Sequence, residues 1–282
     1  MKYLVLTADD FGLADEVNQG IERAHVEGIL TAASLMVGAP ATGGAVELAR
    51  RLPRLRVGLH LTLTDAKPVL PASAVPDLVD ARGRFRANMA RSGAAMFFLP
   101  HVKRQVRAEI RAQFEAFRAT GLKLDHVNAH KHFHLHSSIL IAILDLAKEF
   151  GVRAVRAPFE PAPILARIEP QRLRPSAFAA LARRQRARLR QAGVAAPDQV
   201  FGLAWSGAMT GSRLTGLIAH LPDGITEIYT HPATASDFAG AAPGYRYQEE
   251  LAALTSPDLR RQIAEAGVAS GGFLDAIEFG RA

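Results

Sequence analysis

The chain has 282 residues, of which 49% are hydrophobic and 22% charged, enough to bury a sizeable core. It contains no Cys, which excludes disulfides and thiolate metal sites and favours a reducing cytoplasm. The net charge of +7 comes with no nucleic-acid recognition motif, so we expect no nucleic-acid partner. No apolar run is long enough to span a bilayer, and the first predicted strand leaves no room before it for a signal peptide.

The first predicted strand ends in two adjacent carboxylates. Residues 3 to 12 read Tyr-Leu-Val-Leu-Thr-Ala-Asp-Asp-Phe-Gly, a short apolar run followed by Asp9 and Asp10. Such a run is typical of a buried strand. Neighbouring carboxylates raise each other's cost of ionisation, which a metal ion or a strong donor would relieve. The alternative for this stretch alone is a strand end with an Asp cap for the next helix.

The rest of the chain alternates between strand and helix patterns, which calls for right-handed crossovers and a parallel sheet. Further strands are predicted at residues 32 to 37, 57 to 62, 122 to 128, 152 to 157, 201 to 205 and 227 to 230. Helices are predicted at residues 15 to 28, 42 to 52, 101 to 120, 138 to 150, 176 to 191 and 246 to 267, the last with a break near Pro257. We therefore predict one α/β domain over residues 1 to 282, a distorted (β/α) barrel of about seven strands, closed or partly open.

Two insertions interrupt this alternation. Residues 65 to 100 are too long for an ordinary connection and predict a functional loop over the strand ends, whose Met- and Phe-rich run suits a lid or a lipid groove. Residues 160 to 192 are rich in Arg and include a predicted helix with Phe178, Leu181 and Leu189 as its apolar side. This helix is either a membrane-facing surface that meets anionic headgroups or a solvated Arg-rich helix.

Polar residues of catalytic types fall at the carboxyl ends of the predicted strands. Asp9 and Asp10 end the first, His60 lies in the third, Arg156 ends the fifth and His231 follows the last. This is the face on which α/β barrels carry their chemistry. The sequence therefore predicts one site built from residues far apart in the chain.

The fourth predicted strand runs into a histidine-rich stretch. Five of the ten histidines lie between His126 and His136. In an extended chain alternate residues share a face, so we expect His130, His132, His134 and His136 to point the same way as far as the strand extends. Next to two carboxylates, this pattern favours a metal site over a His-rich surface loop.

One Asp with two His is a common ligand set for a catalytic divalent ion and suits Zn, Fe, Co, Ni or Mn. Such an ion lowers the pKa of bound water toward about 7 and polarises a carbonyl. A second carboxylate can accept a proton from that water, and a histidine can protonate the leaving group. Asp10, Asp9 and His231 fit the roles of ligand, base and acid in amide or ester hydrolysis.

The chain resembles the YdjC-like carbohydrate deacetylase family. The resemblance is carried, in the family's order, by Asp9-Asp10-Phe11-Gly12, Gly58-Leu59-His60-Leu61, His130-Lys131-His132-Phe133-His134 and Tyr229-Thr230-His231-Pro232. The amino-acid sequence of residues 125 to 136 is most similar to that of the hopanoid-biosynthesis-associated branch, HpnK.

The resemblance implies a (β/α) barrel of the glycoside hydrolase/deacetylase type that removes acetyl from N-acetylated sugars with one divalent ion, Zn²⁺ or Mg²⁺. The implied roles are metal ligands Asp10, His60 and His130, general base Asp9, general acid His231, base-orienting Arg156, and substrate contacts His132, His134 and Phe11. The chain departs from the family at Asn128, where many members have Asp. Asn can hydrogen-bond to a metal ligand but carries no negative charge. Asp125 is a candidate to supply the carboxylate that Asn128 lacks.

The similarity to HpnK implies an N-acetylglucosaminyl hopanoid lipid as the substrate, in hopanoid biosynthesis. It also implies that the protein makes peripheral contact with the inner face of the membrane. Free chitooligosaccharide or N-acetylglucosamine is the alternative substrate. A glycoside hydrolase that uses Asp9 and Asp10 fits poorly, because adjacent carboxylates do not flank a sugar from two sides. A non-catalytic metal- or lipid-binding protein is the alternative from another class, and the base and acid beside the ligands argue against it. The sequence predicts no oligomeric state.

Overall fold

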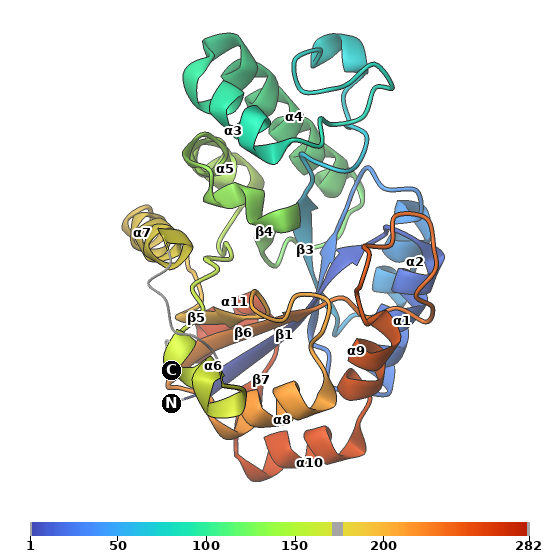
Figure 1. Ribbon diagram of the computed structural model, residues 1–282, viewed down its shortest axis with the longest axis vertical. Helices are drawn as coiled ribbons and strands as arrows, with labels where there is room; N and C mark the ends of the chain where they lie inside the picture. The colour runs from blue at the N-terminus through green and yellow to red at the C-terminus, as the bar shows by residue number, and fades with distance from the viewer. Residues whose placement is uncertain (1, 171–176, 281–282) are drawn as a thin grey trace.

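A parallel sheet organises the molecule (Figure 1), and the computed structural model describes residues 2–170 and 177–280. The strands are β1 (Lys2–Phe11), β2 (Ala32–Leu35), β3 (Arg56–Leu61), β4 (Val127–Ala129), β5 (Gln199–Phe201), β6 (Gly224–Thr230) and β7 (Ala269–Ser270). Their order is β4-β3-β2-β1-β6-β5, with β7 beside β1, and every pairing is parallel. The central strand β1 is buried from its second residue onward, as expected of a parallel strand covered on both faces.

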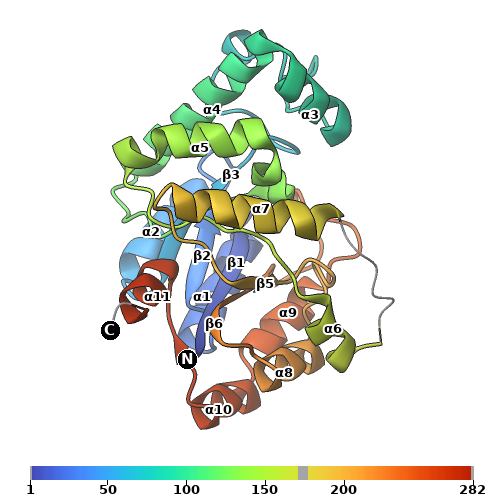
Figure 2. The same cartoon turned by 90° about the vertical axis from the view of Figure 1, so that its left-hand side faces the viewer.

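Helices surround this curved sheet in both views (Figures 1 and 2). They are α1 (Asp15–Val26), α2 (Thr42–Arg51), α3 (Met89–Phe98), α4 (Pro100–Ala119), α5 (Ser137–Phe150), α6 (Ala162–Ile168), α7 (Ala177–Gln191), α8 (Gly211–Ala219), α9 (Tyr247–Leu254), α10 (Pro257–Glu265) and α11 (Phe273–Phe279). Each long helix buries one apolar stripe: α4, for example, turns Val106, Ile110 and Phe114 inward. No helix among residues 2–170 and 177–280 is both long and apolar enough to cross a membrane.

The parallel half-barrel with surrounding helices confirms the predicted fold class. The strand predicted at residues 152 to 157 is reduced to two isolated parallel bridges, Val127 to Val155 and Ala154 to Ala195. The strand predicted at residues 201 to 205 corresponds to β5, which covers residues 199 to 201 instead. It ends before Gly202, whose φ of 130° is not that of a strand. The short elements α3, α6, α8, α11 and β7 carry too little periodicity to have been predicted.

The first insertion is tied to α4 by a buried carboxylate. Glu109 is fully buried and accepts hydrogen bonds from the backbone N–H groups of Val69 and Leu70, at 2.9 and 3.0 Å. The Gln113 amide donates to the same carboxylate at 2.8 Å. A buried charge requires such partners, so Glu109 fixes where residues 65 to 100 leave the barrel.

The Arg-rich insertion forms α6 and α7, and its predicted helix start at residue 176 lies outside the described residues. Phe178 and Leu181 are exposed, as predicted for an apolar outer side. The prediction is wrong for Leu189, which is fully buried. Leu189 lies on the same helix face as Ala182 and Gln185, which both point into the protein, so it belongs to the inner side of α7.

Gly20 on α1 packs directly against the chain that follows β6. A Cβ at this position would lie 2.6 Å from the Ala233 Cα and 2.8 Å from the Pro232 carbonyl oxygen. We predict that Gly20→Ala lowers the free energy of unfolding by about 1–3 kcal/mol, measured by urea unfolding, because backbone must shift to make room.

Gly43→Ala on α2 is the matched control, since a Cβ there meets no atom of the described chain within 4 Å. This substitution should raise the free energy of unfolding by about 0.5–1 kcal/mol, because Ala favours a helix more than Gly does. Equal effects of the two substitutions would contradict the packing argument.

Candidate active site

A cavity of about 450 Å³ opens at the carboxyl ends of β1, β3, β4 and β6. The predicted residues Asp9, Asp10, His60, His130 and His231 all line it. The remaining wall is rich in aromatic side chains: Phe178, Tyr229, Tyr245 and Tyr247. The structure thus brings together residues that the sequence placed on separate strand ends, and it adds flat apolar surfaces suited to a ring-shaped ligand.

Backbone strain is concentrated around this cavity. Within the described chain, the only non-glycine residues with positive φ are Asp10 (63°), Asp65 (60°), Lys131 (53°) and His132 (54°). All of them line the cavity. Each such conformation costs of order 1–3 kcal/mol and persists where surrounding contacts impose it, a pattern typical of functional sites.

Asp10, His60 and His130 form a possible three-residue metal site. The Asp10 Oδ1 atom lies 2.9 Å from His130 Nδ1 and 3.2 Å from His60 Nε2. Ligand atoms of all three residues lie within 4.8 Å of one another. His60 Nε2 is buried and has no hydrogen-bond partner among the described residues. A divalent ion bound by the carboxylate and the two imidazoles would supply that partner. The three residues therefore suit a divalent metal ion.

The electrostatics of the trio favour a cation. Burial lowers the pKa of His130, but the carboxylates of Asp10 and Asp65 outweigh it and raise this pKa to about 10. Burial raises the pKa of Asp10, yet His130 and His60 hold it well below its usual range. Asp65, which the sequence did not single out, lies 3.6 Å from His130 Nε2 and 2.7 Å from Lys131 Nζ. The negative charge around His130 therefore attracts a positive ion to this corner of the cavity.

Asp9 faces a different partner from Asp10. The fully buried Arg156 donates to Asp9 Oδ2 at 2.6 Å and to Oδ1 at 3.0 Å. The same guanidinium donates to Glu227 at 2.6 to 3.0 Å and stacks over the Tyr229 ring at 4.6 Å. Burial raises the pKa of Asp9, but Arg156 outweighs it and holds the pKa far below its usual range. Asp9 is therefore an ionised acceptor at the cavity wall.

Glu227 was not among the predicted site residues, although its place in a strand could have pointed to it. It is the only charged residue of β6, and a charged residue in a buried strand needs a buried partner. Its partner Arg156 lies 71 residues away, which only the fold reveals.

Asn128 connects Asp9 with the possible metal site. Its Oδ1 lies 2.6 Å from His60 Nδ1, and its Nδ2 donates to Asp9 Oδ1 at 3.1 Å. A carboxylate only accepts, so the amide nitrogen faces Asp9 and the amide oxygen accepts from His60. Asp125 does not substitute here, because its carboxylate pairs with His126 Nδ1 at 3.0 Å. An uncharged residue therefore makes both contacts at position 128.

The expectation that alternate histidines after β4 share a face is wrong. Residues His130–Leu135 form a tight 3₁₀ turn, in which Lys131 and His132 are left-handed. His132 lines the cavity and hydrogen-bonds to the Tyr229 hydroxyl at 2.9 Å. Burial holds the pKa of His132 well below its usual range, so the ring is neutral.

Two further predicted substrate contacts lie away from the cavity. His134 is fully buried, and its Nε2–H donates to the Arg156 carbonyl at 3.0 Å. Burial lowers the pKa of His134 to about 3. Phe11 is also fully buried and belongs to the hydrophobic core. Neither residue lines the cavity, so we withdraw both as substrate contacts.

His231 projects into the cavity from the chain after β6. Its backbone N–H donates to the buried Glu250 carboxylate, which also accepts from the Met209 N–H at 2.8 Å. The imidazole packs against Tyr245 at 4.9 Å, and its Nδ1 has no hydrogen-bond partner in the described chain. Glu250, which the sequence did not reveal, therefore fixes the main chain and leaves the ring available.

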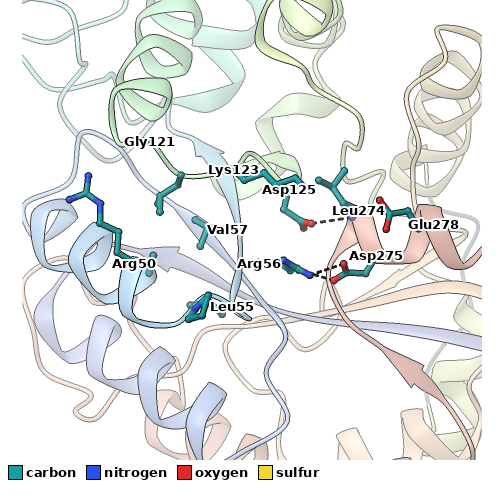
Figure 3. Close-up of a pocket in the computed structure, with 13 residues that line it drawn as sticks. Arg50, Leu55, Arg56, Val57, Gly121, Lys123, Asp125, Leu274, Asp275 and Glu278 are labelled. Carbon is teal, nitrogen blue, oxygen red and sulfur yellow. Dashed lines mark hydrogen bonds and ion pairs between the residues drawn. The ribbon is translucent and has the colours of Figure 1, made fainter.

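A second cavity of about 330 Å³ lies at the opposite, amino end of the barrel (Figure 3). Arg56 and Asp275 form an ion pair at 2.8 Å in its wall, and Asp125 lines the same cavity beside Leu274. It contains none of the residues of the possible metal site. The candidate active site is therefore the cavity at the carboxyl end.

Similarity to known proteins extends over most of the chain. A family model described as YdjC-like protein matches residues 3–265. A carbohydrate deacetylase from Geobacillus stearothermophilus is 32% identical over 95% of both chains. One from Brevibacillus brevis is 44% identical over 55% of this chain and 59% of its own length. A crystal structure from Enterococcus faecalis V583, described as a candidate cellobiose-phosphate cleavage protein, has a TM-score of 0.76 at 28% identity, covering 97% of this chain and 98% of the other.

Replacing Arg156 would leave two buried carboxylates without a counter-charge. We predict that Arg156→Gln lowers the free energy of unfolding by about 3–5 kcal/mol, measured by urea unfolding. The control is Arg111→Gln, which removes an exposed ion pair with Glu149 and should change stability far less. Similar small losses in both variants would refute the importance of the buried triad.

Proposed function

Because the chain belongs to the YdjC-like protein family, we propose that it is a metal-dependent hydrolase that removes the N-acetyl group from an acetamido sugar. The observation that carries this proposal is the placement of an ionised Asp9 beside the Asp10, His60 and His130 trio in one cavity. The relatives described as carbohydrate deacetylases support the substrate class.

We assign Asp10, His60 and His130 as the ligands of one divalent ion. Two imidazoles favour Zn²⁺, whereas Mg²⁺ prefers oxygen ligands throughout. When bound, such an ion acts as a Lewis acid that acidifies water and polarises the acetamide carbonyl.

The protein's own groups supply the proton transfers. Asp9, held ionised by Arg156, accepts a proton from the water that attacks the carbonyl carbon. His231 gives a proton to the sugar nitrogen as the C–N bond breaks, which releases acetate and a free amine. Tyr229 and Tyr245 offer flat faces against which the sugar ring packs. His132 lies beside them as a substrate contact.

We propose an N-acetylglucosaminyl hopanoid lipid as the substrate, in preference to a free chitooligosaccharide. The similarity of residues 125 to 136 to the hopanoid-associated branch supports this choice. Exposed apolar side chains support it too: Phe97, Phe98 and Leu99 at the junction of α3 and α4 are 48%, 72% and 41% exposed. Isolated exposed apolar residues are ordinary, whereas three consecutive ones suit contact with an apolar surface.

The second apolar group lies on α7, whose Phe178 lines the active-site cavity and is 38% exposed. Helices α3, α5 and α7 lie on one side of the molecule, the side that faces the viewer in Figure 2. The helix α7 also carries exposed arginines, including Arg184 and Arg188. Apolar side chains beside cations suit the inner face of an anionic membrane, from which a lipid-linked sugar would enter the cavity.

If Asp9 is the base and the trio binds the metal ion, substitutions at Asp9 and at the ligands should affect metal content differently. Asp9→Asn should keep the metal ion yet lower turnover by about 10²–10⁴-fold, because the base is lost while the ligands remain. His60→Ala and His130→Ala should lose the ion, as measured by elemental analysis of the purified protein.

His220→Ala on the exposed end of α8 is the control and should change neither quantity. Full metal content in His60→Ala and His130→Ala would refute the ligand set. Full activity in Asp9→Asn would remove Asp9 as the base.

The lipid proposal predicts a difference between two substrates. Acetate release should show a higher kcat/KM for an N-acetylglucosaminyl hopanoid in anionic vesicles than for di-N-acetylchitobiose. A Phe97→Ser, Phe98→Ser double variant should lose about tenfold or more on the vesicle substrate alone, since each buried Phe contributes about 1.5–3 kcal/mol. Val26→Ser, at an exposed apolar residue on α1, is the control. Preference for di-N-acetylchitobiose would overturn the lipid proposal and leave the deacetylase proposal intact.

A further inference from the structure

The ring of His231, the proposed general acid, is held in the cavity by packing between two tyrosines. Its Nδ1 is buried and has no hydrogen-bond partner among the described residues, so Nε2 is the ring nitrogen that can meet a substrate. The rings of Tyr229 and Tyr245 lie on either side, with centroids 5.7 and 4.9 Å from that of His231. We infer that Tyr245 is a positioning residue, which sets the angle of the His231 ring and so aims Nε2 at the nitrogen of the scissile amide.

A catalytic histidine ring needs an external constraint to keep one angle. The outer torsion of the side chain joins an sp³ to an sp² atom, and its energy wells are broad. Catalytic imidazoles are commonly held by a third group that bonds to the nitrogen facing away from the substrate. His231 Nδ1 has no such partner in the described chain, and the Glu250 carboxylate bonds to the backbone N–H instead. Packing against neighbouring rings is therefore left to fix the imidazole.

Tyr229 provides a fixed surface on one side of His231. It is 3% exposed, and the Arg156 guanidinium lies 4.6 Å from its ring. Its hydroxyl hydrogen-bonds to His132 at 2.9 Å. The rings of Tyr229 and His231 meet edge to face, at an interplanar angle of 85°. The angle of the imidazole then depends on what packs on its other side.

Tyr245, on the other side, is clasped by the loop that follows β5. Its hydroxyl lies 2.8 Å from Ser206 Oγ, and both residues line the cavity. Gly207 packs directly on the Tyr245 ring, where a Cβ would lie 2.2 Å from two of the ring carbons. The Arg246 N–H donates to the Gly207 carbonyl at 2.6 Å and joins the two loops next to this contact. The ring of Tyr245 is thus anchored independently of His231 and is able to hold it.

The angle of the His231 ring matters because its proton has to reach one atom. As the C–N bond breaks, the bonding electron pair goes to the sugar nitrogen, and the Nε2 proton goes to the same nitrogen to give the free amine. A misplacement of about 1 Å can cost about 100-fold in rate. The inference rests on His231 being the general acid of the proposed function, and it adds the residue that aims this acid.

A double-mutant cycle separates positioning of His231 from any other role of Tyr245. Tyr245→Phe keeps the ring but removes the bond to Ser206, and Ser206→Ala removes the same bond from the other side. Each should lower kcat about 3- to 10-fold, in line with the loss of one hydrogen bond. The assay is acetate release from the better of the two substrates compared above. In a His231→Ala background, each substitution should change kcat less than about twofold, because no imidazole is left to position.

An ester substrate and a matched control complete the test. Hydrolysis of 4-nitrophenyl acetate should be unchanged in Tyr245→Phe and Ser206→Ala, because nitrophenolate leaves without a proton. Ser236→Ala is the control and should leave kcat unchanged, since this exposed serine lies in the loop after β6, does not line the cavity and contacts Gln248 instead.

The inference is overturned if Tyr245→Phe and Ser206→Ala lower kcat equally with and without His231, because Tyr245 then acts by contacting the substrate. An equal loss on the ester also overturns it, since the effect is then a general one on the fold. Unchanged kcat in both variants overturns it as well and leaves the deacetylase proposal standing. Full activity in His231→Ala is a separate result, which refutes His231 as the acid of the proposed function.

Discussion

The buried contact of Arg156 with Asp9 and Glu227 is the interaction on which the rest of the structure depends. The two carboxylates lie on the neighbouring strands β1 and β6, and Arg156 reaches them from a segment that bridges to β4. A buried guanidinium is tolerated only where carboxylates satisfy it, so this contact ties separate parts of the barrel together. The same contact keeps Asp9 ionised at the cavity wall. Fold stability and reactivity therefore share one set of hydrogen bonds.

Adjacent carboxylates in one strand acquire unlike properties because their partners differ. Asp9 faces a guanidinium and an amide, whereas Asp10, at a φ of 63°, faces two imidazoles. Asn128 joins these environments, since its amide contacts both Asp9 and His60. Arg156, Asp9, Asn128 and His60 thus form one connected network of hydrogen bonds. Such a network holds its members in single orientations when every group is satisfied.

The sequence was informative wherever a local pattern determines structure. An apolar run that ends in Asp or His indicates a strand end, and parallel strand ends meet at one edge, so the convergence of the site was predictable. The geometry of the histidine-rich turn was not, because left-handed Lys131 and His132 depend on contacts made by the folded chain. The burial of Leu189 and the pairing of Glu227 with Arg156 likewise depend on which surfaces meet. These are long-range properties that no local pattern contains.

The proposed deacetylation requires that Asp10, His60 and His130 hold a divalent ion. The most direct measurement is acetate release from an N-acetylglucosamine-bearing substrate by chelator-treated protein, as Zn²⁺ or Mg²⁺ is added back. Chelation should abolish acetate release, and activity should return in proportion to the metal bound, saturating at one ion per chain. Full acetate release from protein in which elemental analysis finds no metal would contradict it.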